Sequence, residues 1–399
     1  MLARGTAVLL CFLATLAQAG DWPQWRGPNR DGISPETGLL EAWPKGGPPL
    51  LWKIAGLGEG YSSAAIAAGR LFIQGQRGDE EYVLAFDANT GKQLWRAHTG
   101  ISFNESRGHG PRSTPTVDGE RLYALAADGM LVCLDAATGK TIWGFNIVDH
   151  FHGNVPHWGI SESPLVDGDR VIVTPGGSGA AVVALDKLTG KLLWQSQSGT
   201  AGYSSPMIYD AAGAPKVVVF TSNAAMGLDL ASGKLQWRYE RVANNVANIA
   251  TPIVHGGEIF LSSNYGTGCV LLKTAAGDAS EVYFNRNMQN HYSTSVLVGD
   301  YLYGFSTSIL TAMKFETGEV AWRDRSVGKG SLIYADRHLY ALGEDGVVGL
   351  VEATPASYRE ISRFEISKGG YPAWSQPVIS NGKLYLRDQD NLFCYNIKK

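Results

Sequence analysis

Aromatic and charged residues recur at one position of the chain, two residues before a Ser or Thr that Pro often follows. The aromatic and cationic examples are Tyr61, Arg112, Tyr203, Tyr292, Lys329 and Trp374, and Ser161 and Ile249 fill the other copies. Rings stack on flat ligands, and cations attract anions. If the copies converge in space, the set predicts a binding site for a planar anionic ligand. The alternative is a ring of side chains that simply plugs and hydrates a central channel.

Glu162 is the only acidic residue near this recurring position and stands one residue after it. Two roles are open for its carboxylate. It could bind a hard cation such as calcium, with Asn244, Asn245 or Asn248 as oxygen partners. It could also pair with Arg112 across the mouth of the site. A single carboxylate is a poor calcium site, so the pattern favours the ion pair and predicts no metal centre.

Five of the eight histidines lie between His98 and His157, and the run from Asp149 to His152 is the densest part. Imidazole and carboxylate ligands suit zinc or copper, but the spacing matches no known metal motif. Ordinary hydrogen bonding within loops is the favoured interpretation. No G-x-S-x-G, P-loop or H-E-x-x-H motif occurs, so the sequence offers no catalytic residue for hydrolysis or nucleotide chemistry.

These residues must be positioned by a repeat, small-x-Asp-x-x-Thr-Gly-Lys-x-x-Trp. It is seen best at residues 85–95 and returns at 133–143, 184–194, 227–237 and, weakened, 312–322. Apolar alternation before the Asp predicts a strand. The Asp can accept hydrogen bonds from the following backbone and the Gly tolerates positive φ, so the segment predicts a tight hairpin turn. The strand after the turn ends at Trp, whose ring can pack on a neighbouring repeat.

A second signal fixes the number of repeats. Eight inner strands are predicted to start at the anchor residues Ser63, Thr114, Ser163, Ser205, Thr251, Thr294, Ser331 and Gln376. Seven outer strands follow them, ending near Trp95, Trp143, Trp194, Trp237, Tyr283, Trp322 and Phe364. The eighth outer strand can come from Leu50 to Ile54. We therefore predict an all-β, eight-bladed β-propeller, closed by pairing of this N-terminal strand with the C-terminal blade.

The first residues read as a signal peptide over 1–19, with Arg4, a short apolar run and an A-x-A cleavage site. An N-terminal extension over 20–48 and a propeller over 49–399 complete the predicted organisation. We expect an exported protein, periplasmic or extracellular, without a transmembrane segment. The chain carries 34 basic and 37 acidic side chains in mixed order, which argues against nucleic-acid binding.

Cys133, Cys269 and Cys394 fall in separated repeats, and two of them occupy the small position before the turn. Disulfides require Cα atoms within about 7 Å of each other. We therefore expect three free thiols.

The repeat resembles the tryptophan-docking repeat of the pyrroloquinoline quinone (PQQ) propellers, and the segment from Asp21 to Gly32 is similar to the start of many exported PQQ-like propellers. The resemblance implies one of two activities. Quinoprotein alcohol dehydrogenases of this type bind PQQ and calcium on the axis, whereas the scaffold lipoprotein of outer-membrane β-barrel assembly binds other proteins. The chain lacks the adjacent Cys-Cys pair and the C-x-x-C-H motif of many dehydrogenases, and also the small residue that a lipoprotein site needs before Cys11.

The favoured function is an extracytoplasmic binding or scaffolding module, without a certain cofactor. The alternative is a PQQ- and calcium-dependent alcohol dehydrogenase, in which the resemblance implies that Arg112 or Lys329 would stabilise the reduced quinone. A protein partner would bind the long loops Ile101–Arg112 and Phe145–Gly159, with Ile147, Phe151 and Trp158 as apolar anchors. A small ligand would instead occupy the axial mouth.

Overall fold

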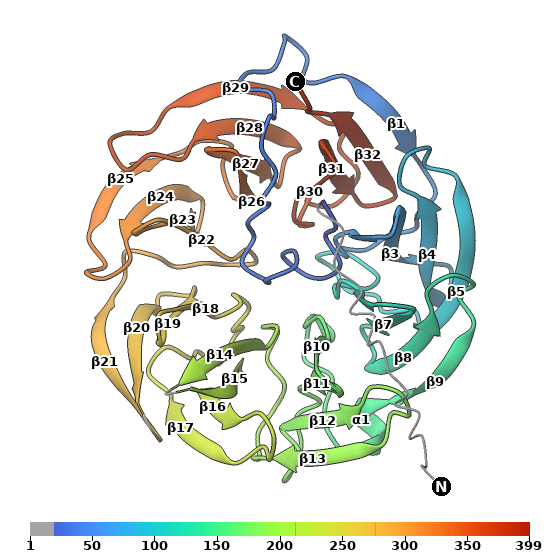
Figure 1. Cartoon of the computed structure of the whole chain (residues 1–399), viewed down its shortest axis with the longest axis vertical. Coiled ribbons are helices and arrows are strands. Elements are labelled where there is room, and N and C mark those ends of the chain that lie inside the picture. Colours follow the sequence, from blue (N-terminus) through green and yellow to red (C-terminus); the bar gives the residue numbers. More distant parts are fainter. Residues whose placement is uncertain (1–19, 212, 276) are drawn as a thin grey trace, which may run out of the picture.

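The computed structural model describes residues 20–211, 213–275 and 277–399. The predicted signal peptide lies outside them. Eight four-stranded antiparallel sheets are arranged as blades around a central axis (Figure 1). A short helix, α1 (Ile147–His150), follows the second blade. This all-β, eight-bladed propeller confirms the predicted fold class. None of the helices in the described ranges has the length and apolar character needed to cross a bilayer.

The blades follow one another along the chain, each running from an inner to an outer strand. Blade 1 comprises β2 (Ala65–Ala67), β3 (Arg70–Arg77), β4 (Glu80–Asp87) and β5 (Gln93–Ile101). Blade 2 comprises β6 (Thr116–Asp118), β7 (Arg121–Leu125), β8 (Met130–Asp135) and β9 (Thr141–Asn146). Blade 3 comprises β10 (Leu165–Asp167), β11 (Arg170–Val173), β12 (Val182–Asp186) and β13 (Leu192–Ser196). Blade 4 comprises β14 (Met207–Ala211), β15 (Ala214–Phe220), β16 (Ala225–Asp229) and β17 (Leu235–Tyr239).

The second half of the ring has the same order. Blade 5 comprises β18 (Ile253–His255), β19 (Glu258–Ser263), β20 (Gly268–Ala275) and β21 (Asp278–Asn285). Blade 6 comprises β22 (Val296–Val298), β23 (Tyr301–Ser306), β24 (Ile309–Lys314) and β25 (Val320–Asp324). Blade 7 comprises β26 (Gly330–Ala335), β27 (His338–Gly343), β28 (Val347–Glu352) and β29 (Glu360–Glu365). Blade 8 comprises β30 (Val378–Ser380), β31 (Lys383–Asp388) and β32 (Asn391–Asn396), with β1 (Leu50–Ile54) as its outer strand.

The ring closes as predicted, by a strand from the other end of the chain. β1 pairs antiparallel with β32, and Trp52 lies opposite Cys394 while Ile54 lies opposite Leu392. This pairing gives β32 the neighbour that it would otherwise lack, so the last blade has no open edge. The first strand of the propeller thus completes the last blade (Figure 1).

The repeat motif forms the predicted turn and a contact between blades. In blade 1 the Asp87 carboxylate accepts hydrogen bonds from the backbone N–H groups of Asn89 and Thr90. The Trp95 ring then covers Gly139 in the turn of the next blade, where an added Cβ would come within 2.6 Å of the ring. Its indole N–H donates to the carbonyl oxygen of Ala136. Glycine is required in this turn because it provides both the positive φ and the space.

The anchor hydroxyls connect the inner strands around the axis. The Ser163 hydroxyl accepts the backbone N–H of Thr114 at 2.9 Å, and the Ser205 hydroxyl accepts that of Ser163 at the same distance. Ser63 likewise accepts the N–H of Gln376, which links blade 8 to blade 1. Ser and Thr recur at this position because each blade needs a short acceptor for an otherwise unpaired buried N–H group.

The three cysteines Cys133, Cys269 and Cys394 are buried and free, as predicted. Burial raises the pKa of the Cys133 thiol to about 11 and the pKa values of the other two to about 12. A thiol at such a pKa is almost entirely protonated at neutral pH, so all three act as small apolar core residues.

The N-terminal extension crosses the centre of the ring before it reaches β1 (Figure 1). Its backbone pairs with blade 1 through Trp22 and Ile66, with blade 7 through Ser34 and Tyr334, and with blade 8 through Leu40 and Ile397. Blades 7, 8 and 1 follow one another around the closed ring, so these backbone pairs hold the extension along one side of it.

Candidate functional site

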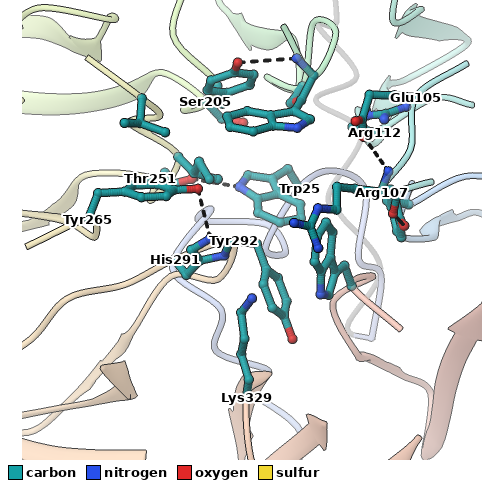
Figure 2. Close-up of a pocket in the computed structure, with 17 residues that line it drawn as sticks. Trp25, Glu105, Arg107, Arg112, Ser205, Thr251, Tyr265, His291, Tyr292 and Lys329 are labelled. Carbon is teal, nitrogen blue, oxygen red and sulfur yellow. Dashed lines mark hydrogen bonds between the residues drawn. The ribbon is translucent and has the colours of Figure 1, made fainter. Parts of the chain in front are cut away.

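A cavity of about 480 Å³ lies at the axis, where the loops that enter the inner strands converge. Figure 2 shows its lining, which combines rings with three cations. Five of the six predicted site residues are in it, namely Arg112, Tyr203, Tyr292, Lys329 and Trp374. Each is the residue two positions before its blade's anchor, and the propeller topology brings these positions together from five blades.

Stacked rings form one wall of the cavity. Trp374 lies between Tyr61 and Tyr292, with ring centroids 5.3 Å and 5.1 Å from its own. Trp158 and Tyr203 form a second pair, at 5.7 Å. Rings in such tilted and offset arrangements attract one another, so the wall is stiff before any ligand arrives.

Two cations are held against these rings. The Arg112 guanidinium lies over Tyr61 and Phe103 and donates to the carbonyl oxygens of Gly108 and Gly110. Burial lowers the pKa of this guanidinium. Arginine side chains stay protonated in proteins, so Arg112 supplies a positive charge. The Lys329 ammonium lies 5.2 Å from the centroid of Trp374 and 3.6 Å from a carboxylate oxygen of Glu344.

His291 adds an uncharged polar group to the cavity. Burial, reinforced by the positive charges of Lys329 and Arg107, lowers the pKa of its imidazole to about 4. The ring is therefore neutral at physiological pH. Its Nε2 lies 3.0 Å from the Tyr265 hydroxyl, while its Nδ1 is buried without a hydrogen-bond partner among the described residues.

The prediction that Glu162 lies at the mouth is wrong. Its side chain is 1% exposed, and its carboxylate accepts from the backbone N–H and the hydroxyl of Thr174. In blade 1 the Ser62 hydroxyl accepts the equivalent N–H, of Gln74. Successive residues of an extended chain point to opposite sides, so the residue after each mouth position faces into the blade.

Neither role considered for Glu162 is therefore realised. Burial raises its pKa to about 7, and the nearby charge that offsets this is Arg30, from the extension, not Arg112. Asn244 and Asn248 bond within their own loop: Asn248 accepts the N–H of Asn244, and Asn244 accepts that of Ala247.

The predicted apolar anchors on the loop Phe145–Gly159 are also wrong. Ile147 and Phe151 are buried in the core of blades 2 and 3, where α1 packs. Trp158 is half-buried and lines the axial cavity. This loop presents no apolar surface built from those three residues, because the helix turns its apolar side inward.

Several lining residues were missed in the sequence, among them Trp25, Glu105, Arg107 and Tyr265. Three of these lie on loops that the repeat pattern does not reach. Trp25 belongs to the extension, and its indole N–H donates to the anchor hydroxyl of Thr251 at 2.9 Å. The only signal for it was an aromatic and arginine-rich segment outside every repeat, whose position relative to the axis no periodicity predicts.

The donor set of the cavity does not fit a calcium–quinone centre. Calcium needs six to eight oxygen ligands, with carboxylates prominent among them. Glu105 is the carboxylate that lines this cavity, and its oxygens already accept from Ser106 and from the backbone N–H of Arg107. Across the described ranges no three His, Cys, Asp or Glu side chains are grouped to hold a metal ion. His150 packs on Phe145, and His109 bonds to Tyr371.

Comparisons with known proteins agree with this architecture. Residues 79–324 match the protein family described as outer membrane protein assembly factor BamB. The BamB of Yersinia pestis is 22% identical over 75% of this chain and 76% of its own length. Quinohemoprotein alcohol dehydrogenase ADH IIB of Pseudomonas putida is 26% identical over 60% of this chain, but the match spans only 30% of that enzyme.

Solved structures show the same fold. BamB from Moraxella catarrhalis superposes with a TM-score of 0.64 at 18% identity, covering 88% of this chain and 97% of that one. Quinohemoprotein alcohol dehydrogenase from Comamonas testosteroni superposes with a TM-score of 0.72 at 13% identity, covering 96% and 82%.

Proposed function

The chain belongs to the protein family of outer membrane protein assembly factor BamB, and from this premise we propose that it is an exported binding propeller, not a quinoprotein dehydrogenase. Its export rests on the signal-peptide pattern of residues 1–19. The donor set of the axial cavity argues against a dehydrogenase, because its one carboxylate, Glu105, already bonds within its own loop.

We propose further that the axial cavity binds a small, flat, anionic ligand, of which PQQ without calcium is one example. The observation that supports this proposal is that stacked rings converge with Arg107, Arg112 and Lys329 in one cavity. This lining is rich in donors and poor in acceptors. A neutral sugar needs both, whereas a carboxylate needs donors and positive charge. The rings supply flat faces for the conjugated part of the ligand.

Calorimetric and thermal-shift titrations test this proposal, with PQQ as the probe in buffer containing EDTA. A ligand that binds only the folded protein must stabilise it, by about 2.7 kcal/mol when its concentration is 100 times Kd. We expect a raised Tm without added calcium. The double variant Arg112→Ala with Lys329→Ala should lose this shift.

The matched control is Lys368→Ala. Lys368 also forms an ion pair, with Asp345, but is absent from the cavity lining. This control should keep the full shift. A shift that appears only with calcium, or one that the double variant retains, would contradict the proposed site.

Scaffolding of another protein is the second candidate, favoured by family membership and by the loop Ile101–Arg112. Ile101 is 64% exposed at the start of this loop, and Arg107 is exposed beside the cavity mouth. A partner held there would be lost on Ile101→Asp with Arg107→Glu, measured by co-purification from cells. The axial ligand shift should survive Ile101→Asp alone, because Ile101 is outside the cavity lining.

A further inference from the structure

Two arginines fasten the extension to the inner ends of the blades. Arg26 is 1% exposed and donates to the carbonyl oxygens of Thr294 and Ser295 in blade 6, at 3.1 and 2.7 Å. Arg30 is 3% exposed and donates to those of Ser163 and Pro164 in blade 3, at 2.9 and 3.1 Å. Removing a buried charged donor from such carbonyls leaves them unpaired, so the segment is held firmly where it crosses the axis.

Trp25 directly precedes the first of these two arginines in the sequence. Its indole N–H donates to Thr251 in blade 5, and its ring lines the axial cavity. Figure 2 shows the Trp25 ring in the middle of the lining residues, with Tyr265 on one side of it and Arg107 on the other. The mouth residues Tyr292 and Ser161 precede the carbonyls that bind Arg26 and Arg30 by only two or three positions in sequence. Trp25 therefore lies just beneath the mouth, as its floor.

We infer that the extension is the specificity element of the axial cavity: the ligand's flat face rests on Trp25, and ligand binding and docking of residues 22–33 stabilise each other. The inference rests on the proposed axial ligand and deepens it by naming the residue that meets the flat face. Because Trp25 is not part of any blade, occupancy must be linked to docking of the extension, and linkage of this kind is reciprocal.

Two glycines of the extension, Gly32 and Gly38, provide a variant that weakens docking of the extension without changing the cavity lining, and a matched control. Gly32 has φ of +78°, and a Cβ there would come within 2.9 Å of both the Arg26 guanidinium and Val296. Gly38, in the same extension, has φ of +72° with nothing within 4 Å of its Cβ position. An alanine therefore meets similar backbone strain at both positions but disturbs Arg26 only at position 32.

The experiment measures PQQ affinity by calorimetry in EDTA for the wild type and four variants. We expect Trp25→Ala and Gly32→Ala to weaken binding by about tenfold or more, and Trp25→Phe by less, since it keeps a flat ring. Gly38→Ala and the wild type should agree within about twofold. Hydrogen exchange on the wild type adds a readout that needs no variant. Saturating PQQ should slow exchange of the Trp22 and Gly32 amides, which bond to Ile66 and Arg26.

The outcomes separate the two proposals. If the wild type binds PQQ but Trp25→Ala binds equally well and the extension amides exchange at an unchanged rate, the inference about the extension is wrong and the axial site stands. If the wild type does not bind PQQ, the axial site and this inference both fall. Should Gly32→Ala fail to fold, the Trp25 variants and the exchange data still decide.

Discussion

Glu81, on β4 of blade 1, has a buried carboxyl whose environment makes the stability of the fold depend on pH. One oxygen accepts the N–H of Ala127 at 3.0 Å, and the other has no hydrogen-bond partner in the described part of the chain. Burial raises its pKa to about 8, with the Asp128 carboxylate acting in the same direction. The folded state therefore holds a proton that the unfolded chain, with an ordinary pKa near 4.5, releases.

We predict that this carboxyl lowers the free energy of unfolding as pH rises. Between pH of about 4.5 and 8 the folded protein binds more protons than the unfolded one, so stability is greatest below this window and is lost through it. Glu81→Gln should remove this part of the slope and be more stable than the wild type at pH 8.5, by on the order of 2 kcal/mol. Urea unfolding at pH 5.5 and 8.5 measures the difference.

The exposed Glu316→Gln is the control for this measurement and should follow the wild type at both pH values. A stability difference between Glu81→Gln and the wild type that is the same at pH 5.5 and pH 8.5 would contradict the prediction.

Single residues were predicted well where the repeat determines side-chain direction and poorly where it does not. Arg112 and Trp374 reach the cavity because the mouth position faces the axis in every blade. Glu162 does not, because it is one residue out of phase and bonds to Thr174 inside its blade. One copy of the repeat does not show which of these two neighbouring residues faces the axis and which faces into the blade. Ser62, which occupies the position of Glu162 in blade 1, also faces into its blade, where it accepts the N–H of Gln74.

At the scale of elements, the closing strand β1 is held by its docking tryptophan as well as by its backbone. Trp52 donates its indole N–H to the Asn89 carbonyl oxygen, and its ring covers Gly91 of blade 1. We predict that Trp52→Ala lowers the free energy of unfolding by about 2 kcal/mol, less than a fully buried tryptophan because the ring is half-exposed. Chemical denaturation followed by circular dichroism measures the loss.

Leu94→Ala is the comparison for this substitution. It shortens an exposed side chain on the outer strand of blade 1 and should cost less than about 0.5 kcal/mol. Equal losses for both variants would show that the Trp52 contact contributes nothing special to closure.

The elements of the propeller follow from the sequence because each blade repeats the same turn, anchor and docking residue. The extension could not be placed in this way. Residues 20–48 have no period, and their position depends on arginines that bond to backbone carbonyl oxygens, which every residue type presents alike. A sequence therefore gives no indication of which carbonyls Arg26 and Arg30 select.

For the whole molecule, the three cysteines of the described ranges lie buried in separate blades, which predicts that their thiols react only after unfolding. Cys133 lies in blade 2, Cys269 in blade 5 and Cys394 in blade 8. Without a reducing agent, the protein lacking residues 1–19 should yield three reactive thiols per chain after unfolding and almost none before it. Ellman titration with and without denaturant measures both numbers. A count of one after unfolding would indicate a disulfide and contradict the structure.

The pairing of β1 with β32 also has a consequence for the time at which the protein can fold. Leu50 is among the first propeller residues to leave the ribosome, yet its partner Tyr395 is among the last. Contacts between such distant positions form slowly, because a long loop must close before any pairing energy is gained. Until then β1 has no partner, and its unpaired edge is open to other chains. The newly made protein should therefore be prone to aggregate until β32 has been made and paired, and a chaperone that shields β1 would help most in this interval.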